Sequence, residues 1–116
     1  MSLLARVVEQ HQGDVPIAAV EGEIDASNAV EVRERIRALL TNRSRALVVD
    51  LTHTSYVDSA GINLLFALGA ALAERQQELH LVMPPSSPLA RTISITGLDA
   101  TVPIHARLEE ALEPLG

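Results

Sequence analysis

A hydroxyl and a carboxylate stand together at the start of a long apolar segment, in the sequence Asp58-Ser59-Ala60-Gly61. A serine at the start of a helix lies beside unpaired backbone N–H groups and the positive end of the helix dipole, which favour an anion. A phosphoryl group on Ser59 would add about −1.5 to −2 charges there without unfolding the chain. Asp58 and Ser59 are also residue types that commonly cap helices. The motif therefore indicates a helix start that could carry a phospho-acceptor.

A nucleophilic serine is the second chemistry that Ser59 could perform. The nucleophile elbow of a hydrolase places glycine two residues before and two after the serine, directly after a strand. Here Val57 occupies the first position, and the nearest predicted strand ends at residue 51. The base would have to be His80 or His105, which lie in no recognisable context. A small serine hydrolase is therefore the weaker alternative.

An acidic loop precedes the first predicted helix, within VEGEIDASNA at 20–29. Its residue types are those of a turn and a helix cap. If strands 15–22 and 46–51 are neighbours, this loop lies beside residue 59 and Asp25 adds negative charge near the serine. Asp25 and Asp58 could then accept a hydrogen bond from the hydroxyl or help to position a metal-bound phosphate donor.

The elements that must position these residues alternate between strands and helices. Short apolar or β-branched runs predict strands, 3.6-residue periodicity predicts helices, and QHQGD at 10–14 makes the first two strands a hairpin. The order β-β-α-β-α-β-α-β-α predicts an α/β domain with a mixed four- to five-stranded sheet and about four flanking helices. The predicted strands are 3–9, 15–22, 46–51, 79–83 and 101–105, and the predicted helices are 28–40, 60–75, 86–98 and 106–115.

Capping residues mark two of these helices. Asp25 or Ser27 is the predicted N-cap of helix 28–40. Ser87 as N-cap, Pro88 at the first helical position and Gly97 at the end bound helix 86–98.

Helix 60–75 is apolar nearly all round. One face can cover the sheet, whereas Leu64, Leu68 and Ala71 fall toward the other side, where an outer helix should be polar. Either a second helix covers this side, or it is exposed to a partner. An exposed apolar side next to Ser59 would place a charge switch beside a hydrophobic contact. It would also make self-association possible, and the sequence leaves the oligomeric state open.

Composition limits the other possibilities. The chain has 116 residues, enough for a single domain over 1–116, and 47% of them are apolar. With 15 acidic and 9 basic residues its net charge is −6, which disfavours direct binding of nucleic acids or anionic membranes. The four scattered histidines and the absence of cysteine give no metal-site pattern. Segment 62–73 is too short to insert across a membrane, and the N-terminus does not resemble a signal peptide, so a cytoplasmic protein is expected.

Four segments carry a resemblance to STAS domains. GEID at 22–25, VVDL at 48–51, YVDSAGINLL at 56–65 and ITGL at 95–98 stand in the order and spacing of this family. The chain looks most like the bacterial anti-sigma factor antagonists, and the resemblance covers essentially its whole length. The Asp-Ser-x-Gly signature after a DL strand is its most specific element.

The resemblance implies a regulator without catalytic activity or cofactor. In the family the unphosphorylated protein binds an anti-sigma factor, usually a serine kinase of the histidine-kinase-like ATPase fold, and thereby frees a sigma factor. The kinase phosphorylates the serine that follows the aspartate, and a metal-dependent serine phosphatase reverses the modification. By position, Ser59 is the phospho-acceptor. The implied partner-binding residues are Asp25, Asp58, Ser59, Ala60, Gly61, Ile62, Asn63 and Leu64.

Two residues depart from the family pattern. Ala60 stands where many members have a second Ser or Thr, which leaves one candidate acceptor, and Asn63 stands where a small residue is common. Related STAS proteins serve instead in stressosomes, in phospholipid-transport complexes or as transporter tails. A constitutive scaffold or a subunit of such a complex is therefore the alternative to a partner-switching antagonist.

Overall fold

The computed structural model describes residues 4–115. The first residue of the predicted strand 3–9 and both ends of the predicted domain 1–116 lie outside the described residues.

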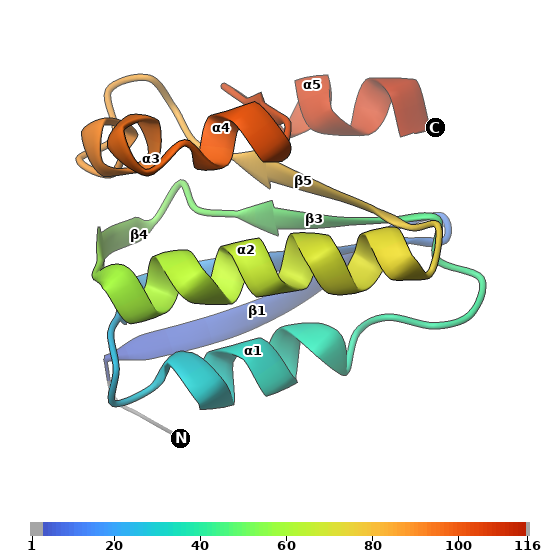
Figure 1. Ribbon diagram of the computed structural model, residues 1–116. Helices are drawn as coiled ribbons and strands as arrows, with labels where there is room; N and C mark the ends of the chain where they lie inside the picture. Colours follow the sequence, from blue (N-terminus) through green and yellow to red (C-terminus); the bar gives the residue numbers. More distant parts are fainter. Residues whose placement is uncertain (1–3, 116) are drawn as a thin grey trace.

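Within residues 4–115, six strands form one mixed sheet in the order β1-β2-β3-β5-β6, with β4 paired to β2 (Figure 1). Among these described strands only β1 and β2 pair antiparallel, as the predicted hairpin requires, and the other pairs are parallel. The predicted pairing of the second and third strands is confirmed, with Ile17 opposite Val48. The strands are β1 (Ala5–Gln12), β2 (Val15–Ile24), β3 (Ala46–Asp50), β4 (Thr54–Val57), β5 (Glu78–Val82) and β6 (Ile104–His105).

Strands β3 and β4 lie one after the other along the same neighbour, β2. Residues 17–19 of β2 pair with β3, and residues 22–24 pair with β4. The buried Thr54 side chain fastens the junction, since its Oγ1 donates a 2.6 Å hydrogen bond to the Val20 carbonyl. Strand β4 therefore brings the chain to the end of β2, directly before Ser59.

Helices cover both faces of the sheet. Figure 1 shows α2 running across the sheet, with α1 beside it. The larger core lies on this face, where Leu65, Leu68 and Leu72 of α2 are buried. The last helix, α5, packs on the other face through Ala111. The helices are α1 (Ala29–Arg37), α2 (Ser59–Glu74), α3 (Ala90–Thr96), α4 (Leu98–Thr101) and α5 (Leu108–Leu112), with a short 3-10 helix at Glu113–Leu115.

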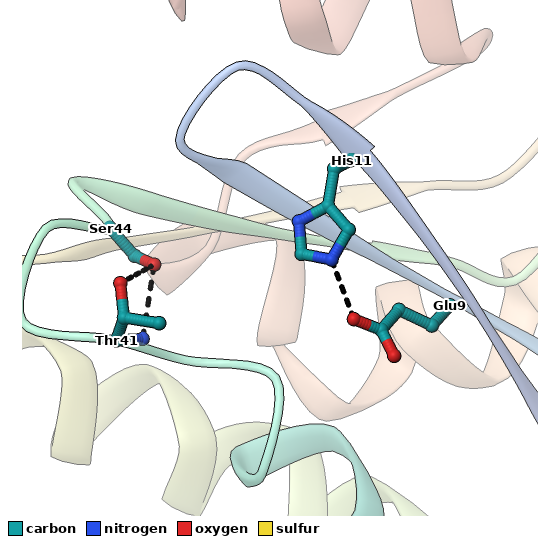
Figure 2. Close-up of polar contacts among 4 residues, drawn as sticks. All are labelled: Glu9, His11, Thr41 and Ser44. Atoms are coloured by element: carbon teal, nitrogen blue, oxygen red, sulfur yellow. Dashed lines mark hydrogen bonds and ion pairs between the residues drawn. The ribbon is translucent and has the colours of Figure 1, made fainter.

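Figure 2 shows two local polar contacts, one in the turn between α1 and β3 and one on strand β1. In the turn between α1 and β3, the Ser44 hydroxyl accepts from the Thr41 backbone N–H at 3.1 Å and lies 3.2 Å from the Thr41 hydroxyl. On the edge strand β1, His11 pairs with Glu9. Charged groups on an edge strand oppose pairing with another sheet.

The α/β architecture is confirmed, but the predicted four or five strands and about four helices are too few. Strand β4 was missed because it has four residues and no continuous apolar run. Predicted helix 86–98 begins later, at Ala90, since the Ser87 hydroxyl caps a turn by accepting from the Leu89 N–H rather than starting the helix. The predicted helix is two helices in the structure, α3 and α4, separated at Gly97. Gly97 has a φ of 78° and ends α3, as predicted.

Three further boundaries differ from the sequence prediction. The N-cap of α1 is Asn28, not Asp25 or Ser27. Strand 101–105 shortens to β6 because Thr101 closes α4. Helix 106–115 reduces to α5 and the 3-10 helix. Within residues 4–115, no helix combines the length and hydropathy needed to cross a membrane.

Candidate functional site

Asp58 joins two segments of the chain at the start of α2. Its Oδ1 accepts hydrogen bonds from the N–H groups of Ala60 at 2.9 Å and Gly61 at 3.1 Å, so Asp58 is the N-cap. Its Oδ2 accepts from the Ala26 N–H at 3.2 Å. The Asp58 N–H in turn donates to the Ile24 carbonyl at 3.2 Å. One carboxylate therefore both starts the helix and holds the loop that follows β2.

Gly61 allows the first turn of α2 to sit directly on the sheet. A Cβ at this position would lie 2.4 Å from Val57 Cγ1 and 3.1 Å from Ile24 Cγ2. Neither methyl group can move far, since both residues belong to the core. The glycine of the Asp-Ser-Ala-Gly motif is thus needed for close packing.

The loop after β2 is held by Asn28, which is 1% exposed. Its Oδ1 accepts from the Asp25 N–H at 2.9 Å, and its Nδ2 donates to the Glu23 carbonyl at 2.8 Å. The Asp25 carboxylate turns toward Ser27, accepting from that residue's N–H and hydroxyl. The loop lies beside Asp58, as the predicted strand pairing requires, but the Asp25 carboxylate is bonded to Ser27 rather than to Ser59.

Ser59 is the first residue of α2 and is exposed. Within the described chain its hydroxyl has no hydrogen-bond partner. Asp58 already occupies the N–H groups of Ala60 and Gly61, so these donors are not free for an anion. A phosphoryl group on Ser59 would stand in solvent beside the Asp58 carboxylate.

The histidines considered as bases are engaged elsewhere. His80 Nδ1 lies 3.0 Å from His105 Nε2, the two rings stack with centroids 5.2 Å apart, and His80 Nε2 pairs with Glu78. His105 has a pKa below its usual range, first because of burial and then because of the charge of His80, while Glu110 opposes the shift. Strand β4 does lead directly into Ser59, contrary to the sequence prediction, yet no described histidine contacts the hydroxyl.

The structure brings the predicted partner-binding residues together at one end of the molecule but gives them different roles. Ser59 and Asn63 are exposed, whereas Asp25, Asp58 and Ala60 are half-buried. The remaining three are buried and support the surface from beneath. They are Gly61, Ile62 and Leu64.

The apolar outer side of α2 is covered in part by α1. Leu64 and Leu68 are 4% and 1% exposed, and α1 packs against α2. The sequence left open whether a second helix covers this side of α2 or a partner does. For these two leucines, the structure shows a covering helix. The α1 residues Val30 and Arg33, which line the gap between the two helices, were missed. No signal in the sequence indicated them, because a groove between two helices depends on how the helices pack and not on the pattern of either one.

A mixed sheet covered by helices on both faces, with an exposed serine at the capped start of α2, defines a domain of the STAS type. The family model for the STAS domain matches residues 6–111, and the chain belongs to this family.

Relatives identify the particular branch that this chain resembles. It is 38% identical to an anti-sigma-B factor antagonist of Listeria monocytogenes over 85 residues, covering 73% of this chain and 74% of the relative. It is 30% identical to the anti-sigma-F factor antagonist RsfB of Mycobacterium tuberculosis over 105 residues, covering 90% and 84%. A crystal structure of an anti-sigma factor antagonist from Mycobacterium paratuberculosis matches with a TM-score of 0.83 at 29% identity, covering 95% and 92%. The resemblance seen in the motifs is thus confirmed at the level of the family.

Proposed function

We propose that this protein is a partner-switching anti-sigma factor antagonist whose state is set by phosphorylation of Ser59. The main observation behind this proposal is that the Ser59 hydroxyl is exposed at the capped start of α2 and has no hydrogen-bond partner in the described chain. A kinase can reach such a hydroxyl without unfolding the domain. The relatives named as antagonists of anti-sigma-B and anti-sigma-F factors support this reading.

The switch acts through charge at the surface rather than through refolding. Asp58 already saturates two N–H groups of the first turn, so a phosphoryl dianion on Ser59 gains little inside the domain. It adds repulsion and a desolvation cost to any partner that packs on this end of the molecule. The unphosphorylated form therefore binds the anti-sigma factor, and the phosphorylated form releases it.

The partners follow from this proposal. The anti-sigma factor is a serine kinase of the histidine-kinase-like ATPase fold, and a metal-dependent serine phosphatase restores the binding form. The protein itself supplies the phospho-acceptor and the docking surface and performs no catalysis. We place this exchange of partners in the cytoplasm.

Phosphorylation assays test the proposal directly. Each serine kinase of this class encoded in the source genome is purified and incubated with the protein and radiolabelled ATP. We expect one kinase to add one phosphate, and Ser59→Ala to abolish the incorporation. Ser27→Ala and Ser55→Ala are matched controls, because both serines are exposed and close to the site, and both should still be labelled. Labelling that persists in Ser59→Ala would refute the assignment of the acceptor.

Binding measurements separate the switch from a constitutive scaffold. Ser59→Asp should weaken binding to the same kinase by about tenfold or more, as expected for a charge introduced into an interface. Equal binding by wild type and Ser59→Asp would instead favour a permanent interface, as in a stressosome or a phospholipid-transport complex.

A further inference from the structure

A groove runs between α1 and α2 and begins at the end of the molecule that carries Ser59. Its volume is about 360 Å³. Ala29, Val30 and Arg33 line it from α1, and Ala60, Asn63 and Ala67 line it from α2. Asn63 lies one turn after Ser59 on the same side of α2, since residues four apart share a helix face. The groove therefore begins within one helical turn of the phospho-acceptor, at the neighbouring residue Ala60.

The apolar part of the groove is made of small side chains and one exposed larger one. The alanines leave room for a side chain from outside. Val30 is 63% exposed, although it borders the buried Ala29. A single exposed valine is ordinary, but one on the wall of a groove floored by Leu64 adds to a continuous apolar surface.

The polar part of the groove includes one cation, the side chain of Arg33. Arg33 is the only charged residue among those that line it in the described chain. Its Nε has no access to solvent and no hydrogen-bond partner, while its Nη2 reaches Glu34 at 3.3 Å. The side chain as a whole is 37% exposed, so a carboxylate can approach it from outside. The exposed terminal amino groups of the guanidinium, and not the inaccessible Nε, form the fork of donors that a carboxylate would meet.

We infer that this groove receives an acidic side chain, with an apolar side chain next to it, from the anti-sigma kinase; the inference rests on the proposed function. The acid pairs with Arg33, and the apolar neighbour packs against Val30 and the alanines. Arg33 supplies the one positive charge among the residues that line the groove in the described chain, so a carboxylate is the charged group that this groove favours. Arg33 is therefore a specificity residue for the partner, beside the switch at Ser59.

Charge variants of α1 test this assignment against the kinase that labels Ser59. The dissociation constant is measured by calorimetry for the unphosphorylated wild type, Arg33→Gln and Arg33→Glu, at 50 and 300 mM salt. We expect Arg33→Gln to weaken binding by about tenfold and Arg33→Glu by more, with a smaller salt dependence than wild type for Arg33→Gln. Val30→Ala should weaken binding with the salt dependence of wild type, because it removes only apolar contact.

Arg35→Glu is the matched control. It makes the same change of net charge on the same helix, at an exposed position that does not line the groove. Denaturation curves establish that all variants fold. Equal dissociation constants for Arg33→Glu and Arg35→Glu would overturn the inference while leaving the proposed function intact. If no kinase labels Ser59 or binds the protein, both are refuted. Binding of a second copy to the groove, seen as a dimer lost in Arg33→Glu, would also overturn the assignment to the kinase.

Discussion

Removal of the Asp58 carboxylate should destabilise the domain more than an ordinary capping substitution. In Asp58→Ala the helix loses its N-cap, which costs about 1 kcal/mol. A negative charge at the positive end of α2 is lost as well, which costs about 0.3–1 kcal/mol. The hydrogen bond from Ala26 contributes about 1 kcal/mol more. We therefore expect the free energy of unfolding to fall by about 2–3 kcal/mol.

A serine at the same position divides this cost into its parts. In Asp58→Ser the hydroxyl can still accept from the N–H groups of the first turn, but it is too short to reach Ala26 as well. Its expected cost is about 1–2 kcal/mol, so Asp58→Ala should be the less stable variant by about 1 kcal/mol. The free energies come from urea denaturation followed by circular dichroism, with linear extrapolation.

Two results would refute this reasoning. A loss below about 0.5 kcal/mol in Asp58→Ala would mean that the carboxylate does not join the two segments, since that is the range of neutral surface substitutions. Equal stability of the serine and alanine variants would mean that the cap itself contributes nothing.

The remaining predictions concern residues around the same framework. Gly61→Ala should lower the free energy of unfolding by about 1–2 kcal/mol in the same assay, because the added methyl group would overlap Val57 Cγ1 and the gain in helix propensity offsets only part of this overpacking. Gly69→Ala, whose methyl group would meet Val102 at 3.3 Å, is the control and should cost less; a larger cost than in Gly61→Ala would contradict the packing argument. Lowering the pH from 7.5 to 5.5 should destabilise the protein, because burial and His80 lower the pKa of His105, so the unfolded chain takes up its proton first as the pH falls through the ordinary histidine value of about 6.5. His105→Asn should reduce this loss of stability, measured as the shift of the urea midpoint between the two pH values. The same shift in wild type and His105→Asn would contradict the assignment to His105. The free energy of unfolding of Ser59→Ala should lie within about 0.5 kcal/mol of the wild-type value, because the Ser59 hydroxyl is exposed and has no partner in the described chain. A larger change would reveal a structural role for the hydroxyl.

Local features of the chain were sufficient to predict much of the framework. Asp58 was one of two candidate caps for α2, and the structure selects it. Gly97 was expected to end a helix that Ser87 and Pro88 begin, and the structure places it in the left-handed conformation at the end of α3. Strand β4 could not be predicted in this way, since its four residues are specified by pairing with β2 rather than by their own pattern. The N-cap of α1 was missed because the Asn28 side chain serves the loop behind it, where it bonds Asp25 and Glu23.

Sequence alone determined the order of the elements, the capped start of α2, the position of Ser59 and the family to which its motifs belong. These features depend on hydrogen bonds and side-chain periodicity among residues close together in the chain, so the local sequence is enough to predict them. The tertiary structure decided which surface surrounds the serine. Ala26 meets Asp58 across 32 residues of chain, the Asp25 carboxylate turns to Ser27, and Arg33 faces a groove made with α2. Such juxtapositions follow from the packing of helices on a sheet whose strands pair across long separations, so no local pattern of residues specifies them.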